Sequence, residues 1–346
     1  MAYTAIDDSG LYFNTKLYTG TGSSLANTGV GFQPDWVWIK GRSGATEHVL
    51  TDSVRGVTKE LSSDDTGAEE TVAQGLTAFG SDGFTVGTDG SYNTSSATYT
   101  SWNWKAGTTS GIATNGSTDI TPSAYSFNQT AGFNVFKFTG AGNSGDTVAH
   151  GLGAIPEFII IKVTGTTHGW ITYHGALGGT KNLNLETSNG AATAVSRWNN
   201  TNPDSVNITL GNSNNVNGAS TEYICYAFSG KQGYSKFGEY TGNGNANGTF
   251  VFLGFKPAFI LFKKYSDTSE WSMFDNKRNT FNVVNHHVYA DLPNAEGDDD
   301  DLDFLSNGFK HRSAAGNTNG SSATYIYAAF AEAPFVNSNE VPCNAR

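Results

Sequence analysis

The sequence has little charge and no long apolar stretch. Only 15% of its 346 residues are charged, and 31 acidic against 20 basic side chains give a formal net charge of −11. Nonspecific binding of DNA or RNA relies on clustered Lys and Arg, so we expect no nucleic-acid partner. No apolar run approaches the ~20 residues of a membrane span, so no membrane insertion is expected. The start, MAYTAIDDSG, has neither a basic nor an apolar segment, and no cleaved secretory signal is expected there.

Cysteine is also scarce. Cys225 and Cys343 are too few for a disulfide framework, and both are predicted to be free thiols. The hydrophobic fraction of 37% is low, yet 22 Phe, 15 Tyr and 7 Trp are too many aromatic side chains for a disordered chain. The protein is therefore expected to fold, and its length allows two or three domains.

What the chain does contain is a threefold repeat. An aromatic-Thr-Gly-x-Gly phrase begins each copy, at residues 18–22, 138–142 and 240–244. A Pro-led apolar run ending in Lys follows, at residues 34–40, 156–162 and 257–263. Each copy closes on a Tyr-led run, at residues 99–104, 223–228 and 325–330. Such agreement at three places indicates tandem modules. We expect the leading prolines and the terminal lysines to be structurally equivalent, because a register shift would invert the buried face.

The residues of these runs predict β structure throughout. They are rich in Val, Ile, Phe, Tyr, Trp and Thr, and Gly, Asn, Ser and Asp separate them. We predict an all-β protein of three tandem β-sandwich modules, jelly-roll or lectin-like, because about 100 residues is the size of such a module. The expected parts are module 1 at 1–107, a Ser/Thr/Gly-rich linker at 108–131, module 2 at 132–230, module 3 at 233–335 and a tail at 336–346.

One column of the repeat holds ring side chains. Fourteen residues after the leading prolines stand His48, Trp170 and Trp271, and Tyr92 lies beside a polar turn of module 1. Flat rings exposed on β-sandwich loops could stack on sugars, so these four residues are candidates for a carbohydrate-facing surface. The same column is also typical of a hydrophobic core, and both interpretations stay open.

A second column mixes acids and a histidine. Eighteen residues after the prolines stand Asp52, His174 and Asp275, and Arg55 and Arg278 follow the two Asp by three residues. This column could supply a general acid or base, or it could be an Asp–Arg contact that braces a turn, replaced in module 2 by His and Leu177. The chain has neither G-x-S-x-G nor H-E-x-x-H, and we predict that it is not an enzyme. Paired carboxylates for glycoside hydrolysis stay an alternative.

The one candidate metal site lies in module 3. His286, His287 and Glu296 precede an acidic run, of which Asp298, Asp299, Asp300 and Asp301 are the candidate ligands. Oxygen-rich loops suit Ca²⁺, although the spacing of an EF-hand is missing, and a solvated acidic loop is the alternative. No other cofactor is expected. The G-x-G-x-x-G phrase at 140–145 is followed by no helix and predicts a turn with positive φ rather than a nucleotide site.

The phrases YTGTG, PDWVWIK, DSVRG, SDGFTVG, YTGNG, DFLSNGFK and TYIYAAFAE resemble a repeated β-domain of structural proteins in the virions of marine tailed bacteriophages. The resemblance covers residues 2–335 and implies a virion protein, assembled in the host cytoplasm and displayed as a tail fibre or similar appendage. It implies contacts with other virion proteins and with host surface glycans. A head (capsid) decoration protein and a carbohydrate-active enzyme are the alternatives.

Assembly can also be predicted. Identical chains usually associate with closed symmetry, so we expect a homo-oligomer. Phage fibres are commonly trimers, so the resemblance implies a homotrimer as the first choice. The linker between modules 1 and 2 is much longer than that between modules 2 and 3. We therefore expect modules 2 and 3 to pack together and module 1 to stand apart, rather than a closed ring of three modules.

Overall fold

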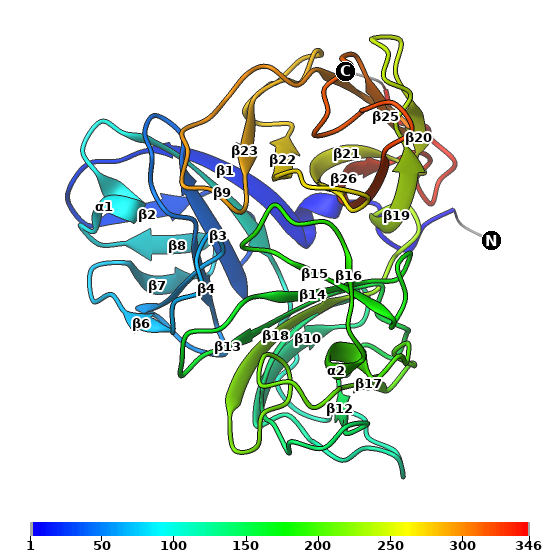
Figure 1. Cartoon of the computed structure of the whole chain (residues 1–346). Coiled ribbons are helices and arrows are strands. Elements are labelled where there is room, and N and C mark those ends of the chain that lie inside the picture. Colours follow the sequence, from blue (N-terminus) through cyan, green and yellow to red (C-terminus); the bar gives the residue numbers. More distant parts are fainter. Residues whose placement is uncertain (1–2, 345–346) are drawn as a thin grey trace.

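The computed structural model describes residues 3–344, which form strands joined by turns and irregular loops with very little helix (Figure 1). They form 26 strands, a 3₁₀ turn η1 (Ser9–Leu11) and two single-turn helices, α1 (Gly90–Asn93) and α2 (Val195–Trp198). Named strands pair antiparallel within the described part. The predicted all-β class is therefore confirmed.

The strands fall into three sets, each a larger sheet with a smaller one, and each set comes from one copy of the repeat. Module 1 has β1 (Phe13–Thr19), β9 (Thr98–Trp104), β3 (Trp36–Gly41), β4 (Val49–Asp52), β5 (Lys59–Ser62) and β6 (Glu70–Thr71), with β2 (Leu25–Thr28), β8 (Gly83–Val86) and β7 (Leu76–Gly80). Module 2 has β10 (Ala124–Asn128), β11 (Phe133–Thr139), β18 (Glu222–Phe228), β13 (Phe158–Val163), β14 (Ile171–His174), β15 (Lys181–Asn184) and β16 (Ala192–Thr193), with β12 (Thr147–Ala149) and β17 (Asn207–Thr209). Module 3 has β19 (Ser235–Thr241), β26 (Thr324–Pro334), β21 (Phe255–Lys264), β22 (Trp271–Asp275) and β23 (His287–Tyr289), with β20 (Phe250–Phe252), β25 (Gly308–His311) and β24 (Leu302–Leu305).

The large sheets share one register. The first aromatic residue of each Pro-led strand lies opposite the last one of the Tyr-led strand: Trp36 with Trp104, Phe158 with Phe228, and Phe259 with Phe330. The lysines Lys40, Lys162 and Lys263 lie opposite Thr100, Ile224 and Ile326. Their predicted equivalence is confirmed. The prolines differ in one respect, because β21 begins before Pro257 and is irregular there.

Close backbone packing and a hydrogen bond to a buried Asn explain why each copy begins with the same glycine phrase. A Cβ on Gly20, Gly140 or Gly242 would lie 2.1–2.5 Å from a backbone oxygen of a facing loop. That loop holds a fully buried Asn, whose side-chain oxygen accepts the N–H that follows each glycine: Asn93 from Thr21, Asn217 from Ala141, and Asn319 from Asn243. The second glycines have φ of 63° to 89°, so the predicted positive-φ turn is confirmed.

One hydrophobic core is shared by all three modules. The Pro-led strands alternate between two cores, because successive side chains of a strand point to opposite faces. Trp36, Phe158 and Phe259 point into the shared core, and Val37, Ile159 and Ile260 point into the core of their own module. This alternation explains why the runs are apolar without interruption.

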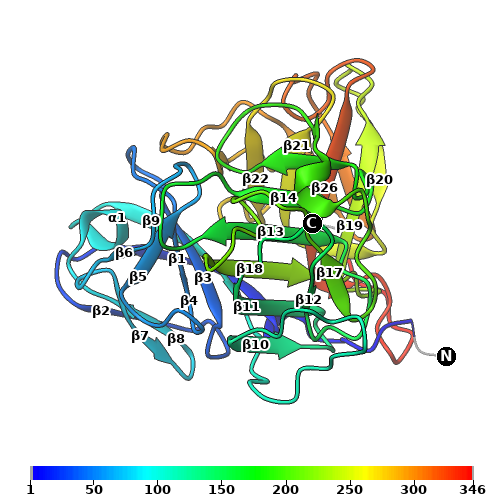
Figure 2. The same cartoon turned by 60° about the horizontal axis from the view of Figure 1, so that its bottom comes forward.

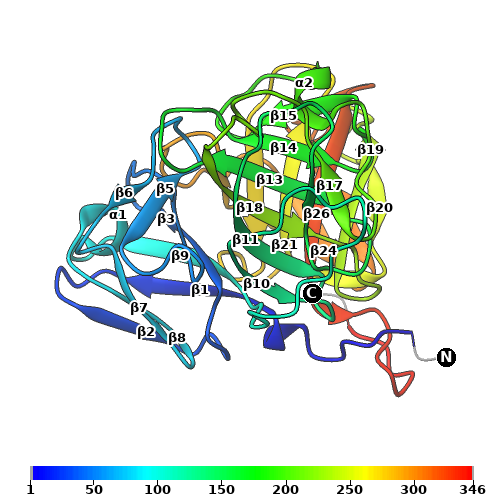
Figure 3. The same cartoon turned by 90° about the horizontal axis from the view of Figure 1, so that it is seen from below.

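Rings from different modules touch in the shared core. The ring centroids of Trp36 and Tyr226 are 4.3 Å apart, those of Trp104 and Phe330 5.6 Å, and those of Phe228 and Phe330 5.5 Å. In Figure 1 the three modules surround this centre, module 1 in blue and cyan, module 2 in green and module 3 in yellow to red. The turned views of Figure 2 and Figure 3 likewise place module 1 against the strands of module 2.

Two predictions about the arrangement of the modules are wrong. Module 1 does not stand apart, because its tryptophans fill the shared core. Residues 108–131 are not only a linker, because they contain β10, which pairs with β11 and extends the sheet of module 2. The extra length that suggested a spacer is thus partly used to build an additional strand. Cys225 and Cys343 are free thiols, as predicted.

Candidate functional sites at the module junctions

Each module meets the next through main-chain hydrogen bonds that repeat around the ring. Three amides donate in one direction: Thr46 to Pro293 O, His168 to Thr66 O, and Ser269 to Ser188 O. Three donate in the other direction: Glu69 to Thr164 O, Ala191 to Tyr265 O, and Glu296 to Arg42 O. All six distances lie between 2.8 and 3.0 Å. Module 1 therefore joins module 2, module 2 joins module 3, and module 3 joins module 1 in a closed ring.

The repeated lysines are buried at these junctions. Each ammonium group donates to a carbonyl of a neighbouring module: Lys40 to Pro293 O at 3.2 Å, Lys162 to Thr66 O at 3.0 Å, and Lys263 to Ser188 O at 2.7 Å. Burial lowers the pKa of each of the three lysines to about 8. Sequence reasoning aligned these lysines without assigning them a role. The available signal was a charged residue repeated at the end of an apolar run.

The rings of the first column also lie at the junctions. His48 Nε2 lies 2.8 Å from Tyr289 O, and the indole N–H groups of Trp170 and Trp271 donate to Ser62 O and Asn184 O. These three side chains are at most 1% exposed, and Tyr92 is 1% exposed beneath the small sheet of module 1. The prediction that His48, Trp170, Trp271 and Tyr92 face a sugar is wrong, because neighbouring strands and modules cover their ring faces.

The second column forms the predicted Asp–Arg brace. Asp52 Oδ2 accepts from Arg55 Nε at 2.5 Å, and Asp275 Oδ2 accepts from Arg278 Nε at 2.6 Å. Both guanidinium groups also donate to the strand before the turn, to Leu50 O and Met273 O. These four side chains are at most 1% exposed, so they reach no substrate from solvent. The turn-bracing interpretation is confirmed.

Module 2 fills the same position without an ion pair. His174 Nδ1 accepts the amide N–H of Ala176 at 3.2 Å, and its Nε2 lies 3.1 Å from Tyr327 O in module 3. Burial lowers the pKa of His174 to about 4, so the ring is neutral near pH 7. Asp52 and Asp275 also make a hydrogen bond across a junction, because they accept from Tyr226 Oη and Trp102 Nε1. The repeat therefore keeps a cross-module hydrogen bond at this position while the residue that makes it changes.

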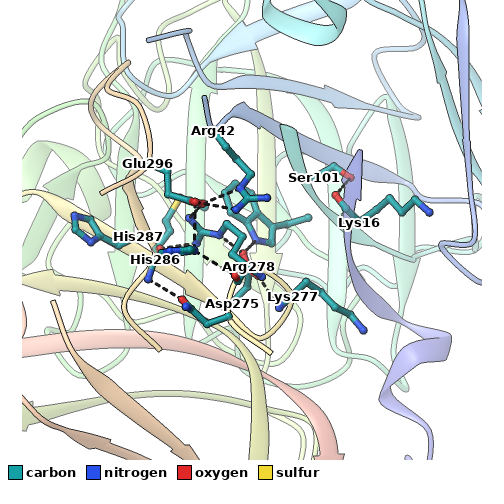
Figure 4. A network of polar contacts seen from close by, with 12 residues as sticks. Lys16, Arg42, Ser101, Asp275, Lys277, Arg278, His286, His287 and Glu296 are labelled. Atoms are coloured by element: carbon teal, nitrogen blue, oxygen red, sulfur yellow. Dashed lines mark hydrogen bonds and ion pairs between the residues drawn. The ribbon is translucent and has the colours of Figure 1, made fainter. Parts of the chain in front are cut away.

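The junction between modules 3 and 1 carries an additional charge network. Glu296 accepts two hydrogen bonds of 2.8 Å from Arg42 in module 1, and Arg278 Nη1 lies 3.4 Å from it (Figure 4). His286 Nδ1 lies 3.4 Å from Glu296 Oε1. The two arginines lower the pKa of Glu296 despite its burial. This network joins the first and last modules, which are not adjacent in the chain.

The acidic run of module 3 does not form the predicted four-carboxylate site. Of Asp298, Asp299, Asp300 and Asp301, only Asp299 and Asp300 come together, and they do so with His287. Ca²⁺ takes six to eight oxygen ligands, so two carboxylates and an imidazole do not match the predicted calcium site. In the part of the chain that the structure describes, these three residues are the group whose ligand atoms are close enough to hold a metal ion.

A surface hollow of about 560 Å³ lies between module 1 and β10. Asp35 supplies the one carboxylate among its lining residues. The oxygens of this carboxylate accept from Ser53 Oγ, Ser126 Oγ and the amide of Ala106 at 2.7–2.8 Å. Glycoside hydrolysis uses two carboxylates, one of them free to donate a proton, so this hollow gives that alternative no support.

The chain is a ring of three β modules around one core, and residues 8–334 match the family described as "Domain of unknown function (DUF7483)". The chain belongs to this family. Neither the curated proteins nor the solved structures contain a match. None of the helices within residues 3–344 is long and apolar enough to cross a membrane.

Proposed function

We propose that this chain is a non-enzymatic structural protein of a tailed-phage virion, displayed on the particle as a tail fibre or similar appendage. The observation that carries the proposal is the closed ring, in which three modules share one aromatic core. A body held together at every junction by buried side chains resists deformation and presents its loops in fixed positions. The resemblance of the sequence motifs to virion proteins supports the proposal that this rigid body is part of a phage particle.

The surface suits attachment to host glycans through loops rather than through a deep pocket. The chain has 15% charged residues, and polar loops join its strands. Each contact would be weak, and many copies on one particle would raise the total strength of binding. The aromatic columns have no part in this binding, because they are buried.

The alternative is a head decoration protein, and the presence of three equivalent junctions within one chain is the specific feature that would suit it. One chain with three equivalent junctions could occupy a threefold position on a particle as a single copy. A homotrimer stays our prediction for the free protein, and light scattering tests it. A mass three times that of the 36.7 kDa chain would agree with the trimer. A mass of one chain would contradict it and favour the single-copy arrangement.

Gold-labelled antibodies against the purified chain would test the function directly on particles. We expect labelled tails or appendages, and preincubation of the antibody with free chain should remove the label. Label on the head would favour decoration. A chain that is made in the infected cells but absent from purified particles would overturn both proposals, as would reproducible hydrolysis of a polysaccharide by the pure protein.

A further inference from the structure

The group formed by His287, Asp299 and Asp300 lies where β23 begins and where the acidic loop approaches β24. One ligand atom from each residue lies within 4.8 Å of the others. His287 Nε2 and Asp299 Oδ1 are 3.4 Å apart. The Asp299 side chain is 82% exposed, whereas His287 and Asp300 are 2% and 4% exposed. Two ligands are thus held in the protein and the third reaches them from solvent.

The backbone holds the ring of His287 in place. The amide and carbonyl of His287 each form a 3.0 Å hydrogen bond with Gly297. A Cβ on Gly297 would lie 2.8 Å from the Nε2 atom, so glycine leaves room for the imidazole. Nδ1 lies 3.2 Å from Asn285 O, and we assign the ring proton to this nitrogen. Nε2 then directs its lone pair at the carboxylates, as in metal-binding histidines whose other nitrogen donates to a carbonyl.

Asp300 provides a second, independent observation that points to a cation at this place. Its Oδ2 atom is buried and has no hydrogen-bond partner. Asp299 and Asp301 are its neighbours in the chain and add negative charge around it. A buried carboxylate without a partner is costly, and a cation would remove that cost.

We propose that His287, Asp299 and Asp300 bind one divalent transition-metal ion, with Zn²⁺ as the best fit. Nitrogen and carboxylate ligands about 2.0–2.1 Å from a tetrahedral Zn²⁺ lie about 3.3 Å from each other. The 3.4 Å separation of His287 Nε2 and Asp299 Oδ1 matches this spacing. Imidazole suits Zn²⁺ better than Ca²⁺, and water would complete the coordination on the exposed side.

Module 3 is the one copy in which this site can form. The strand registers place His287 opposite Phe274, one position before the pair of Val288 with Met273. In modules 1 and 2 the corresponding pairs are Leu61 with Leu50 and Leu183 with Thr172. The residues that precede Leu61 and Leu183, and so correspond to His287, are Glu60 and Asn182. Of the three modules, module 3 is therefore the one with a histidine at this position of the strand.

The position of the site gives the ion a role. The loop that supplies Asp299 and Asp300 also carries Glu296, which binds Arg42 of module 1. Modules 1 and 3 are not adjacent in the chain, so side-chain and main-chain contacts alone close the ring between them. Metal binding would fix this loop on β23 and stabilise that closure.

Calorimetric titration of the purified chain with Zn²⁺, and separately with Ca²⁺, tests the proposal. We expect one Zn²⁺ per chain, no comparable Ca²⁺ binding and a higher melting temperature with Zn²⁺. His287→Gln and Asp300→Asn should each weaken Zn²⁺ binding by at least about tenfold and remove the rise in melting temperature. Asp298→Asn is the matched control, because it makes the same charge change in the same loop outside the group, and it should bind as the wild type does.

The melting temperature measured without metal distinguishes a residue that acts as a metal ligand from one that stabilises the fold. Asp300→Asn should not lower it, since the substitution removes a buried charge that has no partner. If His287→Gln fails to fold, Asp300→Asn still decides the question. Absence of Zn²⁺ binding by the wild type, or equal weakening by Asp298→Asn and Asp300→Asn, would overturn the proposal.

Discussion

The turns after β4 and β22 and the turn after β14 occupy equivalent places but use different chemistry. The first two hold a buried Asp–Arg pair, and the third holds a neutral histidine. The difference follows the residue that each turn meets across the junction. Asp52 accepts from the hydroxyl of Tyr226, and Asp275 accepts from the indole N–H of Trp102. Where the neighbouring module offers a donor, the turn supplies an acceptor.

Module 2 meets a different neighbour. Ala328 stands at the place of Tyr226 and Trp102 and has no donor in its side chain. His174 instead lies within hydrogen-bond distance of the backbone carbonyl of Tyr327. What repeats around the ring is a satisfied hydrogen bond across each junction, and the residue types adapt in pairs. This explains why a column of Asp, His and Asp need not be catalytic.

The largest effect should come from breaking a charged turn. Arg278→Met leaves Asp275 buried without its cation and should lower the free energy of unfolding by ~3–5 kcal/mol. Urea denaturation measures this loss. Lys137→Met is the control, because Lys137 pairs with Glu222 while their side chains are 24% and 48% exposed, and it should cost about 0–1 kcal/mol. Equal losses of unfolding free energy in the two variants would contradict the view that the buried ion pair is more important for stability than an exposed one.

The second-largest loss of stability should come from removing the indole N–H that donates to a charged turn. Trp102→Phe removes the indole N–H that Asp275 accepts, and Trp104→Phe removes a buried N–H without a partner. Both tryptophans lie in the shared core, so the loss of ring area is similar. A hydrogen bond to a charged group contributes about 1.5–3 kcal/mol, so Trp102→Phe should be more destabilising by that order in urea denaturation. A greater loss for Trp104→Phe would refute the complementarity across this junction.

The turn of module 2 that holds the neutral His174 should make the free energy of unfolding depend on pH. The folded state lowers the pKa of His174 from 6.5 to about 4, so the stability from its neutral form is present above pH 6.5. That stability is lost as the pH falls through 6.5 towards 4. Between pH 7 and pH 5 the difference in unfolding free energy between wild type and His174→Gln should shift by about 2 kcal/mol, with the wild type losing more. Parallel pH profiles of the two proteins would show that His174 titrates normally.

The smallest effect concerns the contact that joins module 3 to module 1. Glu296→Gln weakens the two hydrogen bonds from Arg42 and should cost about 1 kcal/mol at pH 7, since both side chains are partly exposed. Glu69→Gln is the comparison in module 1, where the ion pairs with Arg55 and Lys59 are longer, at 3.5 and 3.4 Å. Unfolding measurements should show the smaller loss for Glu69→Gln, and the reverse order would contradict a special role for the junction between modules 3 and 1.

Much of the fold could be predicted from local patterns. The β-branched and aromatic residues of the apolar runs predicted strands, and the repeat predicted that the Pro-led strands are equivalent in register. The Asp–Arg brace was also accessible, because Asp275 and Arg278 are three residues apart and fit one turn. Linker length misled the prediction of module placement, because a chain segment can form a strand such as β10 as well as span a distance.

The β class and the glycine turns follow from residues that are close together in the chain, and the equivalence of the Pro-led strands follows from the threefold repeat. Three features depend instead on contacts between distant segments: the closure of the modules into a ring, the burial of the His48 column and the approach of His287 to Asp299 and Asp300. The lysine contacts that join the modules connect residues 75 to 253 positions apart. Local periodicity says which face of a strand is apolar, but the burial of that face depends on which distant surface packs against it.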